Sequence, residues 1–149
     1  MISQIPIETE GFFKIHNFVN YPLVEIPQTF SDSRGNILNL VDGKLGDVAI
    51  INSVKGSIRA NHYHNEDWHF CFLISGSMEY WWTDLSGKEH PKKLMVNPGE
   101  MVYTPPKIAH KIVFNSDSSF ISISKLSRIS SNYEKDTVRL KSDFFHLSI

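Results

Sequence analysis

Short runs of apolar or alternating residues make up most of the chain, and turn residues separate them. Asp42-Gly43, Ser75-Gly76 and Asn97-Pro98-Gly99 are three of these turns. Helical periodicity is nearly absent, and many short strands at this spacing are typical of an antiparallel sandwich or barrel. The strands expected are 36–41, 47–54, 58–64, 69–75, 78–82, 93–96, 101–104, 110–114 and 120–125. The sequence therefore predicts an all-β fold.

The composition fits one ordinary globular domain over residues 1–149, without a linker or an internal repeat. The formal net charge of −1 gives no electrostatic case for binding nucleic acid or an anionic membrane. No apolar run approaches the roughly 20 residues of a membrane span, and the N-terminus lacks the features of a signal peptide. A single cysteine, Cys71, excludes an internal disulfide. We expect a cytoplasmic protein with irregular arms at the proline-containing start and at the polar tail 127–135.

Four histidines are the candidate site. His62 and His64 are two positions apart in an expected strand, so their side chains lie on the same face. His69 follows a polar break, Asn65-Glu66-Asp67, and begins the next antiparallel strand; His110 begins a later one. Neutral imidazole binds most first-row divalent metals, so this pattern favours a shared metal or substrate site.

Two strands indicate how the site is enclosed. The strand from His69 is apolar on both faces, which requires cover on both, from the barrel interior and from a second sheet or a partner subunit. We therefore expect a homodimer, because a bare face with Phe70, Phe72 and Ile74 would favour aggregation. In the strand from His110, we expect His110 to face inward and Lys111 to face water.

The spacing of these residues resembles the two motifs of the cupin superfamily, a double-stranded β-helix (jelly-roll) barrel. The first motif consists of a Gly, five residues, His-x-His, and then a Glu and a Gly. This chain matches it with Gly56, His62, His64 and Gly76, and has His69 in the position of the Glu. The second is matched by Gly99, Pro105 and His110, with Lys107 and Phe114 in place of its Gly and Asn. The motif core spans residues 56–114.

A narrower resemblance is to nucleotide-sugar cupins, the dTDP-4-dehydrorhamnose 3,5-epimerases and dTDP-4-keto-6-deoxyglucose ketoisomerases. Asp32-Ser33-Arg34-Gly35 is similar to their Asp-x-Arg-Gly opening, and the segment from Gly56 to Tyr63 to the epimerases' Gly-x-x-Arg-Gly-x-His-Tyr. The resemblance implies that His62 is the base and His64 a second proton carrier. It also implies that Arg59 binds a diphosphate, with Arg34 and Tyr103 as further substrate-binding residues.

The role of Arg59 depends on the local backbone, and the acid of the reaction is left open. In a regular strand Arg59 faces away from His62, so its role requires a β-bulge. Tyr63, Tyr80 and Tyr103 are all candidate acids, and the sequence does not choose among them.

The family's epimerases and ketoisomerases work without a metal, whereas this chain has histidine at every metal-ligand position. We therefore expect a divalent ion (Zn, Fe, Ni, Mn or Cu) on His62, His64, His69 and His110, polarising a ketone or enediolate oxygen. Asp67 could orient a ligand histidine, although acids in such turns are more often solvated. The expected function is isomerisation or epimerisation of a keto sugar, with nucleotide-linked sugar as the small-molecule partner. Metal-dependent dioxygenase chemistry and non-catalytic binding of a sugar or other small molecule are the alternatives.

Overall fold

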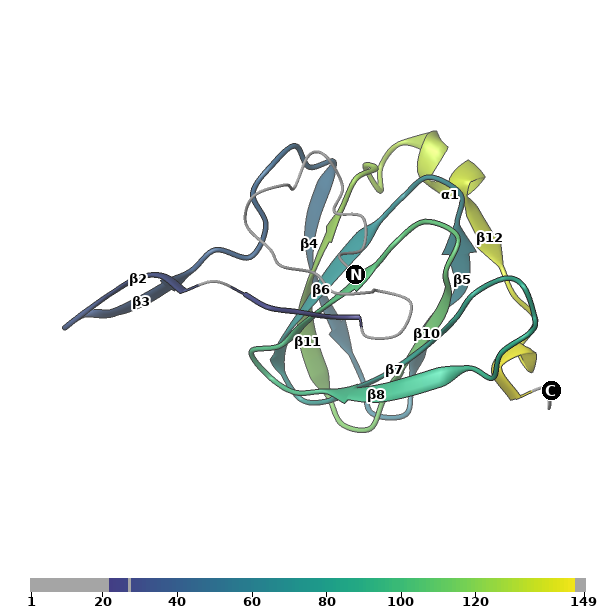
Figure 1. Cartoon of the computed structure of the whole chain (residues 1–149), viewed down its shortest axis with the longest axis horizontal. Coiled ribbons are helices and arrows are strands. Elements are labelled where there is room, and N and C mark those ends of the chain that lie inside the picture. Colours follow the sequence, from purple (N-terminus) through teal and green to yellow (C-terminus); the bar gives the residue numbers. More distant parts are fainter. Residues whose placement is uncertain (1–21, 27, 147–149) are drawn as a thin grey trace.

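The computed structural model describes residues 22–26 and 28–146 (Figure 1), and strands dominate it. Ten of its strands form two five-stranded antiparallel sheets, ordered β1-β9-β6-β11-β4 and β12-β5-β10-β7-β8. The first contains β1 (Leu23–Val24), β9 (Met101–Thr104), β6 (His69–Ser75), β11 (Ser118–Ser124) and β4 (Asp47–Ser53). The second contains β12 (Thr137–Arg139), β5 (Ile58–His64), β10 (Ala109–Phe114), β7 (Met78–Thr83) and β8 (Lys92–Val96).

The two sheets enclose one core, in agreement with the predicted jelly-roll barrel. All nine expected strands are present, with ends shifted by no more than three residues. The largest buried cluster lies between the sheets and includes Leu73, Met78, Val96 and Phe114, each fully buried. In the described part of the chain, no helix is long and apolar enough to cross a membrane.

The polar tail is more ordered than expected, so the prediction of an irregular arm at 127–135 is wrong. Ser130 caps helix α1 (Ser131–Asp136), because its side chain accepts a hydrogen bond from the backbone N–H of Asn132. Strand β12 follows directly and adds to the edge of β5. A 3-10 turn, η2 (Phe144–His146), ends the described chain. The short helix lacks an amphipathic repeat, so periodicity gave no sign of it.

Strand β5 contains the β-bulge that Arg59 needs in order to lie on the same face as His62. Ala60 and Asn61 have positive φ angles of 63° and 57°. In the pairing with β10, His62 lies opposite His110 while Ala60 lies opposite Lys111, so Asn61 is the extra residue. The bulge reverses the alternation and brings Arg59 onto the same face as His62.

Strand β6 is covered on both faces over only part of its length. The outward side chain of Phe70 is fully buried in a second cluster that contains Trp68, Tyr103 and Ile123. The cover for Phe70 therefore comes from this same chain. At the other end of the strand, Ile74 is 44% exposed.

The prediction that Lys111 faces water is wrong, because its side chain is buried. Its Nζ lies 4.7 Å from the centre of the Trp81 ring and 5.5 Å from that of Phe145. The same Nζ is 3.0 Å from His146 Nε2. The C-terminal turn η2 thus covers the outer face of β10, which strand alternation alone could not reveal.

Strands β2 (Gln28–Asp32) and β3 (Gly35–Leu38) form a separate hairpin that projects from the barrel (Figure 1). Arg34 at its turn bonds to Asp32 through its backbone N–H and its guanidinium. Phe30, Ile37 and Leu38 on this hairpin are exposed by 40% or more.

Candidate metal and ligand site

A cavity of about 280 Å³ opens between the two sheets at the histidine end of the barrel. Its polar lining includes His62, His69, His110 and Arg59. Apolar side chains continue it into the core, among them Ile51, Ile112 and Phe120. The volume lies just below the usual range of about 300–1,000 Å³ for ligand pockets.

Three of the predicted ligands converge here, and two of them, His62 and His110, line the cavity. Donor atoms of His62, His64 and His110 all lie within 4.8 Å of one another, and all three residues are buried. The ring of His62 is 4.5 Å from that of His64 and 4.8 Å from that of His110. Strands β5 and β10 are neighbours, so the bulge and the register together produce this convergence.

Burial keeps these three imidazoles neutral. It lowers the pKa of His62 far below its ordinary value, and the nearby His110 and His64 add to this effect. Burial and the neighbouring His69 lower the pKa of His64 to about 3. The pKa of His110 falls to about 4 through burial, although its bond to the Ile108 carbonyl opposes this. Neutral imidazole is the form that binds a metal.

The hydrogen bonds of the three rings leave nitrogen atoms free for a ligand. His110 Nδ1 lies 3.0 Å from the carbonyl oxygen of Ile108, so Nδ1 donates there and Nε2 carries the lone pair that a ligand would use. His64 Nδ1 lies 3.3 Å from the hydroxyl of Thr137. His62 Nδ1 and His64 Nε2 are buried without a hydrogen-bond partner among the described residues. Buried polar atoms of this kind require a partner, so the three residues fit a bound divalent ion.

The fourth histidine, His69, lies beside this group but outside it. Its ring stacks on His64 with a centroid distance of 4.7 Å. Its Nε2 lies 2.9 Å from Asp67 Oδ2, and the two residues form a separate cluster with His64. The four expected ligands therefore fall into two overlapping groups that share His64, and the second group also contains Asp67.

The predicted substrate-binding residues separate in space. Arg59 lines the cavity; its Nε donates to Ser53 Oγ and its Nη2 to the Asn52 carbonyl. Tyr103 packs against Phe70 in the second cluster, away from the cavity, because it lies on the outward face of β9. Arg34 lies on the projecting hairpin and does not line the cavity either. Tyr103 and Arg34 were expected to bind substrate beside the histidines, but neither lines the cavity of this chain.

Among the tyrosines proposed as acids, only Tyr80 lines the cavity, and its hydroxyl is 2.5 Å from that of Thr104. Burial raises the pKa of Tyr80 above its ordinary value. Cys71 also lines the cavity, where burial raises its pKa to about 12 and so keeps the thiol protonated.

Residues of the C-terminal segment complete the site, and sequence reasoning missed them. Tyr133 on α1 lines the cavity, 5.6 Å from the ring of His64. Arg128 Nη1 donates to the Tyr133 hydroxyl, and its Nε pairs with Asp47. Asp136 accepts hydrogen bonds from the backbone N–H groups of Glu66 and Asp67. The only sequence signal was the cluster of polar residues in a segment taken to be irregular.

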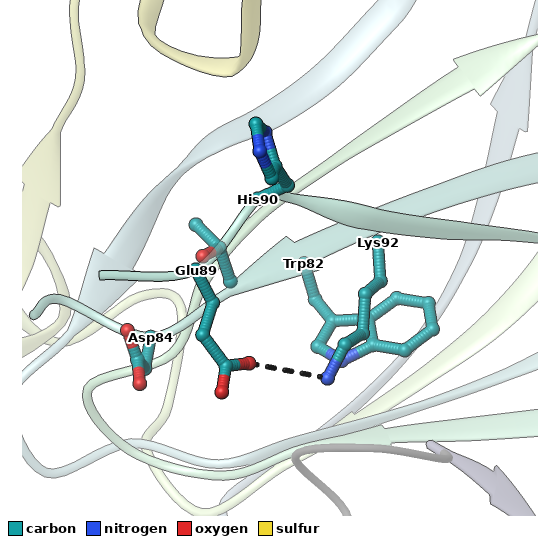
Figure 2. A pocket seen from close by; sticks show the side chains of 6 residues that line it. Trp82, Asp84, Glu89, His90 and Lys92 are labelled. Atoms are coloured by element: carbon teal, nitrogen blue, oxygen red, sulfur yellow. Dashed lines mark hydrogen bonds and ion pairs between the residues drawn. The ribbon is translucent and has the colours of Figure 1, made fainter. Parts of the chain in front are cut away.

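A second hollow, between β7 and the loop before β8, is too small to be a ligand site. Figure 2 shows its lining, with the ion pair between Glu89 and Lys92 drawn beside Trp82. Its volume of about 10 Å³ is that of roughly one water molecule. His90 in its wall is exposed and belongs to neither histidine cluster. It therefore serves as a control position.

Residues 49–124, half of the chain, match the cupin domain family, and the protein belongs to this family. No curated protein sequence gave a significant match.

Solved structures agree on the fold. One is the dTDP-4-dehydrorhamnose 3,5-epimerase from Sulfolobus tokodaii, with 18% identity and a TM-score of 0.67 over 93% of this chain and 88% of that chain. The sugar 3,4-ketoisomerase QdtA from Thermoanaerobacterium thermosaccharolyticum, solved with TDP, has 17% identity and a TM-score of 0.63 over 84% and 92%. The capsular polysaccharide assembling protein CapF from Staphylococcus aureus has 20% identity and a TM-score of 0.58 over 78% of this chain but only 34% of CapF.

Proposed function

We propose that this protein is a metal-binding cupin enzyme that isomerises or epimerises a keto sugar linked to a nucleotide. The observation that carries the proposal is the convergence of three buried, neutral imidazoles, His62, His64 and His110, of which His62 and His110 line a cavity of about 280 Å³. Structural neighbours of the same fold include a sugar ketoisomerase and a sugar epimerase, which supports the reaction class.

His62, His64 and His110 would hold the divalent ion, and the donor set suits Zn, Fe, Ni, Mn or Cu. Such an ion supplies a Lewis acid that stabilises negative charge on a carbonyl oxygen. Three uncharged ligands leave the ion its full positive charge. The metal-free alternative keeps the same residues, with His62 as the base and His64 as a second proton carrier.

The shape and charge of the cavity support a sugar substrate with an anionic group. Its volume suits a sugar ring but not a whole nucleotide, so the nucleotide would lie outside the opening. Arg59 has no carboxylate partner among the described ion pairs, unlike Arg128 and Arg139. A guanidinium with uncompensated charge binds phosphate oxygens well, so Arg59 would hold the diphosphate. Ile112 and Phe120 would exclude water from the ring.

Elemental analysis of the purified protein, together with solvent-deuterium exchange, tests this proposal. We expect close to one metal ion per chain in the wild type and in His90→Ala, and none in His62→Ala. Deuterium should enter TDP-4-keto-6-deoxyglucose when it is incubated with the protein in D₂O. Oxygen uptake with bound iron would instead indicate a dioxygenase, and ligand binding without exchange a non-catalytic sugar-binding protein. Either result would overturn the proposal.

A second copy of this chain is the proposed protein partner. Val48 and Ile50 on edge strand β4 are 59% and 68% exposed, and Phe30 and Ile37 expose similar apolar surface on the hairpin. Exposed apolar surface next to an edge strand favours association. Sedimentation equilibrium should give twice the monomer mass, and Ile50→Lys should lower it towards one chain; a monomeric wild type would contradict this. The cytoplasmic location stays a prediction.

A further inference from the structure

Arg139 lines the same cavity as Arg59, but from a different strand. Strand β12 follows helix α1 and adds to the edge of β5 (Figure 1), where Arg139 lies directly opposite His62. Residues opposite one another in an antiparallel pair point to the same face of the sheet, so Arg139 shares the face of His62. Its side chain is 62% exposed, which places it at the opening of the cavity rather than in the interior.

The charged side chains that line the cavity are mostly paired. Arg128 pairs with Asp47 at 3.2 Å. Arg139 Nη2 lies 3.1 Å and 3.3 Å from the two carboxylate oxygens of Glu134 on helix α1. Among the described residues that line the cavity, Glu134 is the one carboxylate. The positive charge available to an anion therefore depends on whether Arg139 stays with Glu134.

The pair between Arg139 and Glu134 is weak enough to be exchanged. Both side chains are more than half exposed, and exposed ion pairs contribute little to stability. A single guanidinium nitrogen serves both carboxylate oxygens, so the pair lacks the two parallel bonds that make arginine pairs strong. A phosphate group that accepts two bonds from this guanidinium therefore replaces Glu134 at small cost.

A sugar linked to a nucleoside diphosphate carries a negative charge on each of its two phosphates, and Arg59 matches only one of them. We propose that Arg139 binds the second phosphate, and that Glu134 holds Arg139 at the opening until the phosphate replaces it. This inference rests on the proposed function. It adds to that function a second phosphate-binding residue and an acid that lowers the affinity for the substrate.

The two partners of the pair should have opposite effects on binding, with TDP as the probe and isothermal titration calorimetry as the measurement. Arg139→Gln should weaken TDP binding about 10-fold, because a charge-assisted bond to phosphate is lost. Arg139→Lys keeps the charge but not the planar fork, so its affinity should lie between these two. Glu134→Gln should tighten binding about two- to fivefold, because Arg139 is released and a repelling carboxylate is removed.

Two exposed residues that do not line the cavity are the matched controls. Lys135→Gln removes one positive charge from helix α1. Glu89→Gln removes the acid of the exposed pair with Lys92 in the second hollow (Figure 2). Both variants should bind TDP like the wild type. A 10-fold loss in Lys135→Gln would mean that overall charge, rather than Arg139, sets the affinity, and would overturn the proposal.

A purely structural ion pair predicts a different pattern. Arg139→Gln and Glu134→Gln break the same pair, so both would then change the affinity for TDP in the same direction or leave it unchanged. Either result overturns the proposal. Thermal unfolding should give the wild-type midpoint for both variants, and Arg139→Lys supplies the comparison with Glu134→Gln if Arg139→Gln does not fold.

The proposed function and this inference fail in different ways. A wild type that does not bind TDP defeats the nucleotide-linked substrate, and the role of Arg139 with it. A wild type that binds TDP and exchanges deuterium into TDP-4-keto-6-deoxyglucose, with an unchanged KM in Arg139→Gln, defeats the role of Arg139 alone. We expect Arg139→Gln to raise this KM about 10-fold and to leave kcat nearly intact, because Arg139 contacts the diphosphate and not the sugar ring.

Discussion

The two ends of the barrel interior are built from the same strands but differ in chemistry. Strand β10 has His110 near its first residue and Phe114 at its last, and β6 begins with His69 and has the apolar Leu73 further along. Strand β11 also passes from a polar to an apolar end, because its buried Ser124 lies opposite His69 and its Phe120 lies opposite Leu73. One end is thus a polar cavity, and the other is a packed apolar core.

The difference separates stability from function. At the apolar end, Phe114 and Phe120 stack with their ring centroids 5.7 Å apart, and burial of such rings favours folding. At the histidine end, buried nitrogens without partners cost free energy unless a ligand satisfies them. A chain selected only for stability would gain by placing apolar residues at both ends. The retained histidines therefore indicate a function at that end.

The largest effect is expected for Phe114→Ala at the apolar end. Removing the fully buried ring should lower the free energy of unfolding by about 3–5 kcal/mol, because it leaves a cavity in a packed core. Urea denaturation measures this change. Val113→Ala on the opposite face of β10 is the matched control and should cost less than half as much. Equal losses for the two would contradict the comparison.

Metal binding should stabilise the opposite end. At 100 times its dissociation constant, Zn²⁺ is expected to raise the free energy of unfolding by about 2.7 kcal/mol. His62→Ala should abolish this gain, whereas Phe114→Ala should keep it, because Phe114 lies at the other end of the barrel. Thermal melts with Zn²⁺ and with EDTA provide the measurement. An equal gain for His62→Ala would place the metal elsewhere.

The metal-free protein should lose stability as the pH falls below about 6.5. The pKa values of His64 and His110 are lowered to about 3 and about 4, so the unfolded chain takes up protons that the folded chain does not. Stability from these two groups is complete above the unfolded pKa and declines towards pH 3–4. Between pH 7 and pH 6 the free energy of unfolding should fall by roughly 1 kcal/mol. Urea denaturation in the presence of EDTA measures this change. His110→Gln should reduce the slope; an unchanged slope would mean that His110 is not the source.

The smallest effect is expected on the projecting hairpin. Arg34→Ala removes an exposed ion pair with Asp32, and exposed pairs contribute little to stability. The unfolding midpoint and the metal content should both stay unchanged. If Arg34 binds substrate, the variant should raise the KM for TDP-4-keto-6-deoxyglucose and leave kcat nearly intact. A large drop in the unfolding midpoint would show that the hairpin belongs to the packed core.

Much of the fold was predictable, because alternation and turn residues are local signals. The nine strands follow directly from them, and the convergence of His62, His64 and His110 was expected from spacing and family motifs. The helix α1 was not predictable, since a helix of six residues is stabilised mainly by its contacts. The burial of Asp67 beside His69 was not predictable either, because a local reading of a polar turn treats its acids as solvated.

By itself, the sequence determined nine of the twelve strands, the all-β class and the inward face of the histidines, because side-chain alternation is a property of neighbouring residues. Only the tertiary structure decided which residues share the cavity. It brought in Arg59 through a bulge and Tyr133 from the C-terminal segment, and it placed Tyr103 on the outer face of the sheet. Long-range packing makes these choices, because a residue's partners across the barrel lie far away in the sequence.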